Sequence, residues 1–147
     1  MFQHILVPID GSELSERAAS TSLQFASLLG ARVTAFVAEP LPPLPNMASN
    51  AAIYARDADA HLARTEAHAR GVLTRFGALA AEQGVAFEGK FARSESVDQA
   101  IAAAAEEFGC DLIALVTHGR GAFGELMFGS HTKGVMSRSK LPMLVLR

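Results

Sequence analysis

Short apolar runs alternate with helical patterns along this chain, and this alternation limits the possible folds more than any other feature of the sequence. We predict strands at 4–9, 32–38, 85–92, 112–117 and 141–146, with a helical pattern after each one except the last. Strands and helices that alternate in this way form a parallel sheet with helices on both faces. Because crossovers between parallel strands are right-handed, we expect a doubly wound sheet with the strand order 3-2-1-4-5.

The ends of the helices carry recognisable signals. Ser12 is a suitable N-cap for the first helix, and Gly30 is a suitable end for it. Ser96 has the same capping role before the helix that follows the third strand. The longest helical pattern covers 51–83, after a proline-rich stretch at 40–46 that we expect to be a surface loop.

Length and composition agree with a single domain over residues 1–147. Half of the residues are hydrophobic and 19% are charged, which excludes a disordered chain. A formal net charge of -2 without a basic cluster argues against a nucleic-acid partner. No apolar run reaches the roughly 18 residues of a membrane span. The chain begins with Phe2–Val7 rather than a basic leader, so we expect a cytoplasmic protein, with Cys110 as a small buried hydrophobe.

The predicted topology selects a site before any motif is considered. In doubly wound sheets, ligands bind outside the carboxyl ends of the strands, where the strand order reverses. In the order 3-2-1-4-5 this point lies between the first and fourth strands. The residues delivered there are Asp10 after the first strand, and Thr117, His118 and Gly119 after the fourth.

A loop with four glycines follows the fourth strand: Gly119, Gly121, Gly124 and Gly129. Glycines allow backbone N–H groups to approach an anion, and the helix predicted from Ser130 adds unpaired amides and a positive dipole end. Ser130 can cap this helix or donate its hydroxyl to a phosphate. Spacing alone leaves a second interpretation open, in which the glycines only allow turns. The loop lacks the Gly-Lys-Ser/Thr ending of a P-loop, and the first turn lacks the Rossmann G-x-G-x-x-G.

Four segments of the chain together resemble the universal stress protein (UspA-like) family. They are ILVPIDGS at 5–12, FVAEP at 36–40, DLIALVTHGRG at 111–121 and LPMLVL at 141–146. The resemblance covers essentially the whole chain. It implies an adenine-nucleotide alpha-hydrolase-like, Rossmann-like fold and an adenine-nucleotide ligand.

The resemblance also implies roles for individual residues. Asp10 would contact the ribose or adenine, although its side chain can equally bond the backbone of its own turn. The backbone of Val37 would lie against the adenine edge, and Leu115 beneath the base. The remaining expected site residues are Pro8 and Ile9 as a wall, Thr117 and His118 at the strand end, and Gly119, Gly129, Ser130 and the amide of His131 around the phosphates.

Two positions depart from the family's nucleotide-binding pattern. In that pattern a glycine, two residues, a second glycine, nine residues and a third glycine precede Ser or Thr. Gly119, Gly129 and Ser130 fit it, but Val116 occupies the place of the first glycine and adds bulk where ribose or phosphate approaches. His131 is larger than the small residue expected there, but a protonated imidazole can help to bind phosphate. The ligand therefore stays open between ATP, with or without Mg²⁺, and ADP, AMP or cyclic AMP.

Three functions remain as alternatives. The first is a non-catalytic, nucleotide-binding regulatory module of the stress response. The second is a slow ATPase or autokinase, for which the sequence offers no evident base, and the third is a ligand-free dimeric scaffold. His61 and His68 are seven residues apart, which is not the four-residue spacing of a helical zinc pair, so we expect no metal site. The apolar strand within 141–147 is an expected edge, and we predict a homodimer through it.

Overall fold

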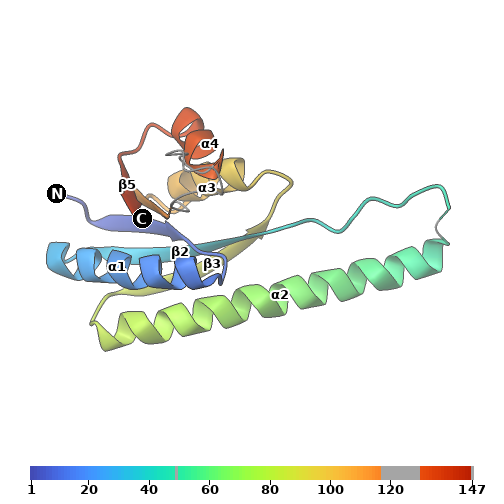
Figure 1. Ribbon diagram of the computed structural model, residues 1–147, viewed down its shortest axis with the longest axis horizontal. Coiled ribbons are helices and arrows are strands. Elements are labelled where there is room, and N and C mark those ends of the chain that lie inside the picture. Colours follow the sequence, from blue (N-terminus) through green and yellow to red (C-terminus); the bar gives the residue numbers. More distant parts are fainter. Residues whose placement is uncertain (49, 117–129, 147) are drawn as a thin grey trace, which may run out of the picture.

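In a computed structural model that describes residues 1–48, 50–116 and 130–146, the chain forms a five-stranded parallel sheet with helices on both faces (Figure 1). The strands lie in the order β3-β2-β1-β4-β5, which confirms the predicted topology. The elements are β1 (His4–Pro8), α1 (Glu13–Leu29), β2 (Arg32–Glu39), α2 (Ala51–Glu82), β3 (Phe87–Arg93), α3 (Val97–Glu107), β4 (Leu112–Val116), α4 (Ser130–Arg138) and β5 (Met143–Leu146).

The central strands separate two hydrophobic cores. In β1, Ile5 and Val7 pack with α1 and α2 on one face, whereas Leu6 packs with α3 and α4 on the other. Figure 1 shows the two pairs of helices on opposite sides of the sheet. Because successive side chains of a strand point to opposite faces, a strand that is covered on both sides needs apolar residues throughout. This explains the continuous apolar sequence of β1 and β4.

The predicted helix caps are present. The Ser12 hydroxyl accepts a hydrogen bond from the Ser15 N–H at 3.2 Å, and the Ser96 hydroxyl accepts one from the Gln99 N–H at 3.4 Å. Gly30 ends α1 in the left-handed conformation, with a φ of 65°. Each cap satisfies backbone groups that a helix end leaves without an intrahelical partner.

Two predicted strand starts were two residues early. β3 begins at Phe87 rather than Val85, because the Val85 N–H donates to the Ala80 carbonyl at 2.9 Å and closes the end of α2. β5 begins at Met143 rather than Leu141, because the Leu141 N–H donates to the Ser139 hydroxyl at 3.2 Å in the preceding turn. In both places the N–H group of an apolar residue forms a hydrogen bond in the preceding turn, so that this residue does not belong to the strand.

Cys110 is a buried thiol, as predicted. It lies in the core beneath α3, packed with Ile113 and Leu6 among others. Burial raises the pKa of this thiol to about 11. Because the thiolate is the reactive form, Cys110 acts as a small hydrophobe at neutral pH.

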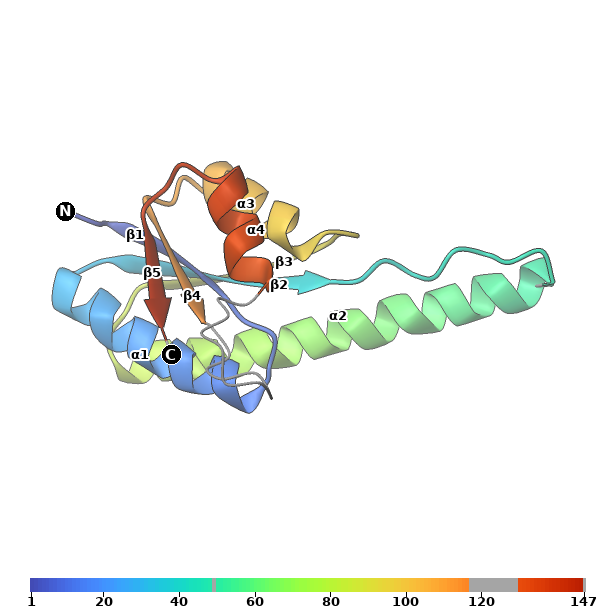
Figure 2. The same ribbon diagram turned by 45° about the horizontal axis from the view of Figure 1, so that its top comes forward.

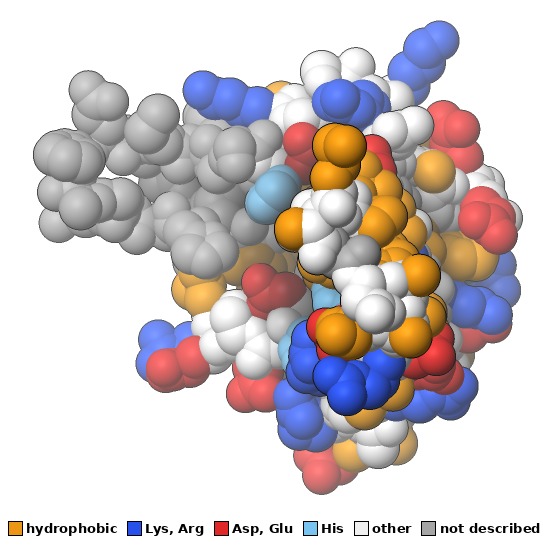
Figure 3. Space-filling view, turned by 90° about the vertical axis from the view of Figure 1, so that its right-hand side faces the viewer, with side chains coloured by type: hydrophobic (Ala, Val, Ile, Leu, Met, Phe, Trp, Pro, Cys, Tyr) orange, Lys and Arg blue, Asp and Glu red, His pale blue; other side chains and the backbone are white. Residues whose placement is uncertain are grey.

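The first half of α2 extends beyond the sheet. With 32 residues, α2 is about 48 Å long at 1.5 Å per residue. The extended segment after β2 runs out beside it, so that residues 40–48 and 50–60 form a protrusion, which we call the arm (Figures 1 and 2). Leu44, Met47 and Ile53 are exposed on the arm. Figure 3 looks at the molecule from this end and shows hydrophobic side chains gathered over the front of the arm.

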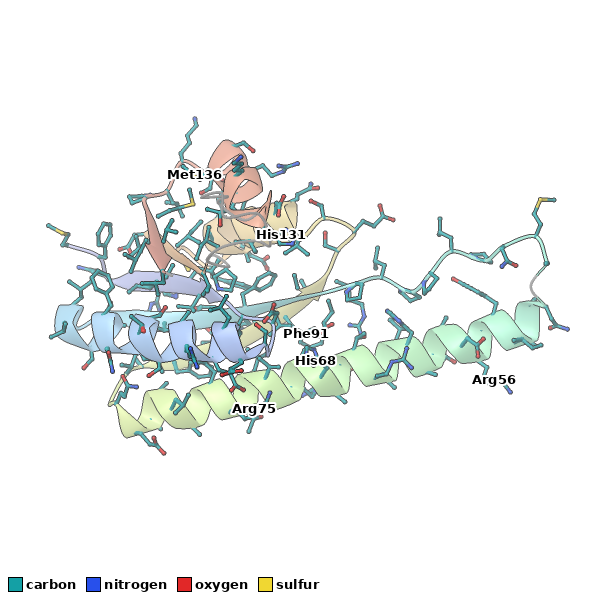
Figure 4. The ribbon with its side chains drawn as sticks, viewed as in Figure 1. Arg56, His68, Arg75, Phe91, His131 and Met136 are labelled. Atoms are coloured by element: carbon teal, nitrogen blue, oxygen red, sulfur yellow. The ribbon has the colours of Figure 1, made fainter. Side chains whose placement is uncertain are left out.

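The base of the arm is tied to the ends of β2 and β3. His68 Nδ1 of α2 lies 2.6 Å from Oε1 of Glu39, whose carboxylate is buried, and Figure 4 shows His68 at this junction. The Arg93 guanidinium donates to the Leu62 carbonyl at 2.8 Å and to the Thr65 hydroxyl at 3.2 Å. These polar contacts fix the angle at which α2 leaves the sheet.

A buried histidine at the amino end of β1 makes stability depend on pH. His4 is 5% exposed, and its Nε2 lies 2.7 Å from the Thr34 hydroxyl. Burial lowers the pKa of His4 below its ordinary value of 6.5. The unfolded chain therefore binds more protons than the folded chain just below pH 6.5, so this histidine removes stability as the pH falls through that range.

We expect His4→Gln to lose less stability between pH 7.5 and pH 5.5 than the unsubstituted protein. The glutamine amide can still bond Thr34 but does not titrate. Urea unfolding midpoints of both proteins at both pH values measure the difference. Parallel losses in the two proteins would show that other groups carry the pH dependence.

Candidate functional site

A cavity of about 210 Å³ opens at the carboxyl edge of the sheet, beside the ends of β1 and β4. These two strands are neighbours. The strand that follows β1 in the sequence, β2, lies on one side of this pair, and the strand that follows β4, β5, lies on the other. The cavity therefore lies at the switch point that the topology predicts. Its wall is formed by Pro8, Ile9, Asp10, Ser12, Leu14, Ser15, Phe36, Ala38, Val97, Ile101, Leu115, Val116, His131 and Thr132.

The structure brings several of the predicted site residues together in this wall. Pro8, Ile9 and Asp10 line it from the end of β1, Leu115 from β4, and His131 from α4. These residues are up to 123 positions apart in the sequence, and the sheet order together with the packing of α4 makes them neighbours. Ile9 and Leu115 are buried, and Asp10 is exposed at the rim.

Asp10 fills the turn role that was weighed against a ligand role. Its Oδ1 accepts from the Ser12 N–H at 2.9 Å, and its own N–H donates to the Ser15 hydroxyl at 3.1 Å. Such an Asx turn sets the direction of the carboxylate. Asp10 also lines the cavity, so that the turn role and a contact with a ligand are compatible.

The side chain of Val37 lies on the face of β2 that is opposite to the cavity. Its side chain is buried in the core beneath α1 and α2, with Ile5 and Val7. The adjacent residues Phe36 and Ala38 are the ones that line the cavity from β2. The role expected of Val37 concerned its backbone, and that role stays a prediction.

Part of the predicted phosphate cradle lies outside the described residues. Thr117, His118, Gly119 and Gly129 belong to this part. Ser130 begins α4, as predicted, and its side chain is also outside the description. Their expected contacts with phosphate stay predictions.

Sequence reasoning missed the contribution of α3 to the site. Val97 and Ile101 of this helix were not predicted as site residues, yet both line the cavity. Asp98 was not singled out, and its Oδ1 lies 2.7 Å from Nδ1 of His131. The one available signal is position, because α3 begins at the carboxyl edge of the sheet, where its first turn reaches the switch point.

The Asp98–His131 contact joins α3 to α4. The Asp98 side chain is 22% exposed, whereas that of His131 is 65% exposed, so the imidazole is the more solvent-accessible group of the pair. Figure 4 shows His131 at the base of α4, next to α3. A Cβ atom at Gly134 would overlap the Asp98 carboxylate, which therefore lies directly against the backbone of α4. Close packing of the two helices holds the pair together.

Two other hollows fit a site less well. The larger, about 700 Å³, lies at the amino edge of the sheet beside Gln3, Arg32 and Asp111. Parallel sheets bind ligands at the opposite edge. Asp111 is also engaged there, since its carboxylate accepts from the Gln3 and His4 N–H groups at 2.8 and 3.0 Å. An apolar groove of about 300 Å³ lies between α1 and α2, with Arg75 and Glu16 at its rim.

Comparison with known proteins assigns the family. The model of the universal stress protein family matches residues 1–147. A Thermus aquaticus protein described as "Universal stress protein in QAH/OAS sulfhydrylase 3'region" is 33% identical over 149 residues, which cover 100% of both chains. The chain belongs to the universal stress protein family. The resemblance seen in the sequence is thereby confirmed.

Solved structures of this family share the fold. A universal stress protein in complex with cAMP is 23% identical, with a TM-score of 0.68 over 99% of this chain and 97% of the other. A universal stress protein from Archaeoglobus fulgidus in complex with dAMP is 16% identical, with a TM-score of 0.61 over 100% of this chain and 98% of the other. The chain thus has the Rossmann-like, adenine-nucleotide alpha-hydrolase-like fold of the family.

The chemistry of the cavity follows from its wall. Ile9, Leu115 and Ile101 offer apolar surface suited to a flat ring, and Asp10 and Ser12 offer polar groups at one rim.

Within the described part of the chain, no three His, Cys, Asp or Glu side chains gather to hold a metal ion. The helices that the structure describes are all too short or too polar to cross a membrane.

Proposed function

We propose that this chain is a non-catalytic regulatory module that binds an adenine nucleotide and acts as a homodimer in the cytoplasm. The observation that carries the proposal is the cavity at the switch point, whose wall includes Pro8, Ile9, Asp10, Leu115 and His131. Membership of a family with members solved in complex with cAMP and dAMP supports the choice of adenine.

The residues of the cavity fit the parts of a nucleotide. The apolar walls from Ile9 and Leu115 suit the two faces of a base, which gains from burial against apolar surface. Asp10 is an acceptor at the rim, as a ribose hydroxyl requires. At the opposite side, His131 and the N-terminus of α4 suit the negative charge of a phosphate.

A binding role fits the titratable groups of this wall better than hydrolysis does. Asp10 and His131 are the acidic and basic side chains among the described lining residues. Oδ1 of Asp10 accepts from the Ser12 N–H of its own turn, and Nδ1 of His131 is bound to Asp98, so that Nε2 of His131 is the nitrogen proposed to contact the phosphate. A hydrolase needs a group that orients an attacking water toward the phosphate.

The edge of the sheet supports a homodimer. β5 pairs with β4 on one side and is the last strand of the described sheet. All residues of β5 are half-buried and apolar. An edge strand of this kind presents backbone groups and apolar side chains to a second copy.

Calorimetry of the nucleotide-stripped protein tests the proposal. We expect binding of at least one of ATP, ADP, AMP and cyclic AMP, with GTP as the control for base selectivity. Light scattering at micromolar concentration is expected to give the mass of a dimer. No binding at millimolar concentrations would overturn the nucleotide role. A monomeric mass would overturn the proposed dimer, and steady release of phosphate from ATP would overturn the non-catalytic role.

A further inference from the structure

The contact between Asp98 and His131 places two groups of opposite possible charge beside the cavity. His131 lines the cavity, and its Nδ1 is bound to Asp98 at 2.7 Å. Among the described residues, none forms a hydrogen bond with the other ring nitrogen, Nε2, which can therefore contact a ligand. Asp98 is sheltered, and its carboxylate lies against the backbone of α4 at Gly134. The carboxylate is therefore in contact with the backbone of α4 as well as with the imidazole.

The net charge of this pair depends on one proton. With a protonated imidazole the pair is neutral, and its ring carries positive charge toward the cavity. With a neutral imidazole the pair keeps the negative charge of Asp98. Histidine side chains in general change their charge between about pH 5 and pH 8, so pH is the variable that tests the pair.

Few other charges of the described residues surround the imidazole. Asp98 faces it from α3, Asp10 lines the same cavity from the turn after β1, and the exposed Lys133 follows it on α4. His118, Arg120 and Glu125 lie outside the described residues. Both acidic neighbours oppose an anion in the cavity, and His131 is the described wall residue that can offset them.

We propose that the Asp98–His131 pair makes the site selective for the phosphate of its nucleotide in a proton-dependent way. The protonated imidazole, held by Asp98, donates a charge-assisted hydrogen bond from Nε2 to a phosphate oxygen. Loss of the proton replaces this attraction with the repulsion of the uncompensated carboxylate. The inference rests on the proposed nucleotide-binding function, and it adds a selectivity device that His131 and Asp98 of this chain supply.

The direction of the effect follows from linkage. An anion that binds the protonated imidazole more tightly than the neutral one favours the protonated state, and the affinity of this anion falls as the pH rises. Uncharged adenosine makes no such contact, so its affinity stays the same. The ratio of the two affinities therefore reports the groups that act on the phosphate, and the His131→Gln variant shows which part of it His131 contributes.

Cyclic AMP is the suitable anionic probe. Its phosphodiester keeps one negative charge from pH 6 to pH 8, whereas the phosphate monoester of AMP titrates near pH 6. We expect calorimetry to give about tenfold tighter binding of cyclic AMP at pH 6 than at pH 8, and equal binding of adenosine at both. In His131→Gln the pH response of cyclic AMP is expected to fall to about twofold or less.

Asp98→Asn separates an electrostatic role from a structural one. At pH 8 this variant is expected to bind cyclic AMP a few-fold more tightly than the unsubstituted protein, because the repelling charge is gone. A merely structural role would weaken binding at both pH values. Lys133→Gln is the matched control, since Lys133 is exposed on the same helix outside the cavity wall, and it should keep the full pH response.

The outcomes distinguish this inference from the proposed function. If neither adenosine nor cyclic AMP binds at either pH, the nucleotide site itself is wrong. If both bind and cyclic AMP shows no pH response, or His131→Gln keeps that response, the selectivity device is overturned and the site stands. NMR of the His131 ring provides a second readout, in which cyclic AMP at pH 7 is expected to move the ring resonances toward those of the protonated imidazole.

Discussion

Gly11→Ala is expected to lower the free energy of unfolding by about 2–4 kcal/mol. Gly11 has a φ of 83°, a conformation that costs an L-residue about 1–2 kcal/mol. A Cβ atom there would also lie 2.8 Å from Cγ2 of Val72 and 3.2 Å from Nε2 of His68. Both neighbours belong to α2, so the added methyl group would push the long helix away from the turn after β1. Urea unfolding measures the loss.

Gly30→Ala provides the control for the backbone part of this effect. Gly30 has a similar φ of 65°, but apart from its chain neighbours no atom of the described residues lies within 4 Å of the position of its Cβ. This variant should lose only the conformational cost, about 1 kcal/mol. The difference between the two variants measures the packing of α2 against Gly11. Equal losses would show that α2 moves aside at no cost and that the contact adds no constraint.

Ala38→Phe is expected to weaken nucleotide binding by about 100-fold, or about 2.7 kcal/mol. Ala38 is half-buried at the end of β2 and lines the cavity. A phenyl ring at this position would take up much of the roughly 210 Å³ in which the base is proposed to lie. Calorimetry with cyclic AMP measures the loss, and the thermal midpoint checks that the protein remains folded.

Ala92 offers a closely matched position for comparison. It pairs with Ala38 in the register of β2 and β3, but it is exposed and does not line the cavity. Ala92→Phe should therefore keep its affinity for cyclic AMP. Unchanged binding in a folded Ala38→Phe would place the nucleotide elsewhere on the molecule.

The sheet order could be predicted because it depends on local patterns and general rules of handedness. Five apolar runs and the helices between them leave few ways to build a doubly wound sheet. The starts of β3 and β5 could not be placed, since Val85 and Leu141 are as apolar as strand residues. Their backbone N–H groups donate to the Ala80 carbonyl and the Ser139 hydroxyl, and a pattern of hydrophobicity does not predict these hydrogen bonds.

The candidate site was predictable where it follows from the strand ends. Pro8, Asp10 and Leu115 come to the cavity because β1 and β4 are adjacent, which the topology requires. The part that Asp98 plays in the site could not be predicted, because Asp98 is 33 positions from His131 and contacts it only through the packing of α3 on α4. Nothing in the spacing of the two residues indicates that Gly134 leaves room for the carboxylate.

The arm has a hydrodynamic consequence. A compact domain of 147 residues has a radius of gyration of about 15 Å, which corresponds to a sphere about 39 Å across, whereas α2 alone is about 48 Å long. The protrusion in Figures 1 and 2 therefore increases the frictional coefficient of the chain without adding to its mass. A monomer will elute from a sizing column ahead of compact proteins of equal mass and imitate a larger species. Scattered light, which reports mass independently of shape, is for that reason the measure that can tell one copy from two.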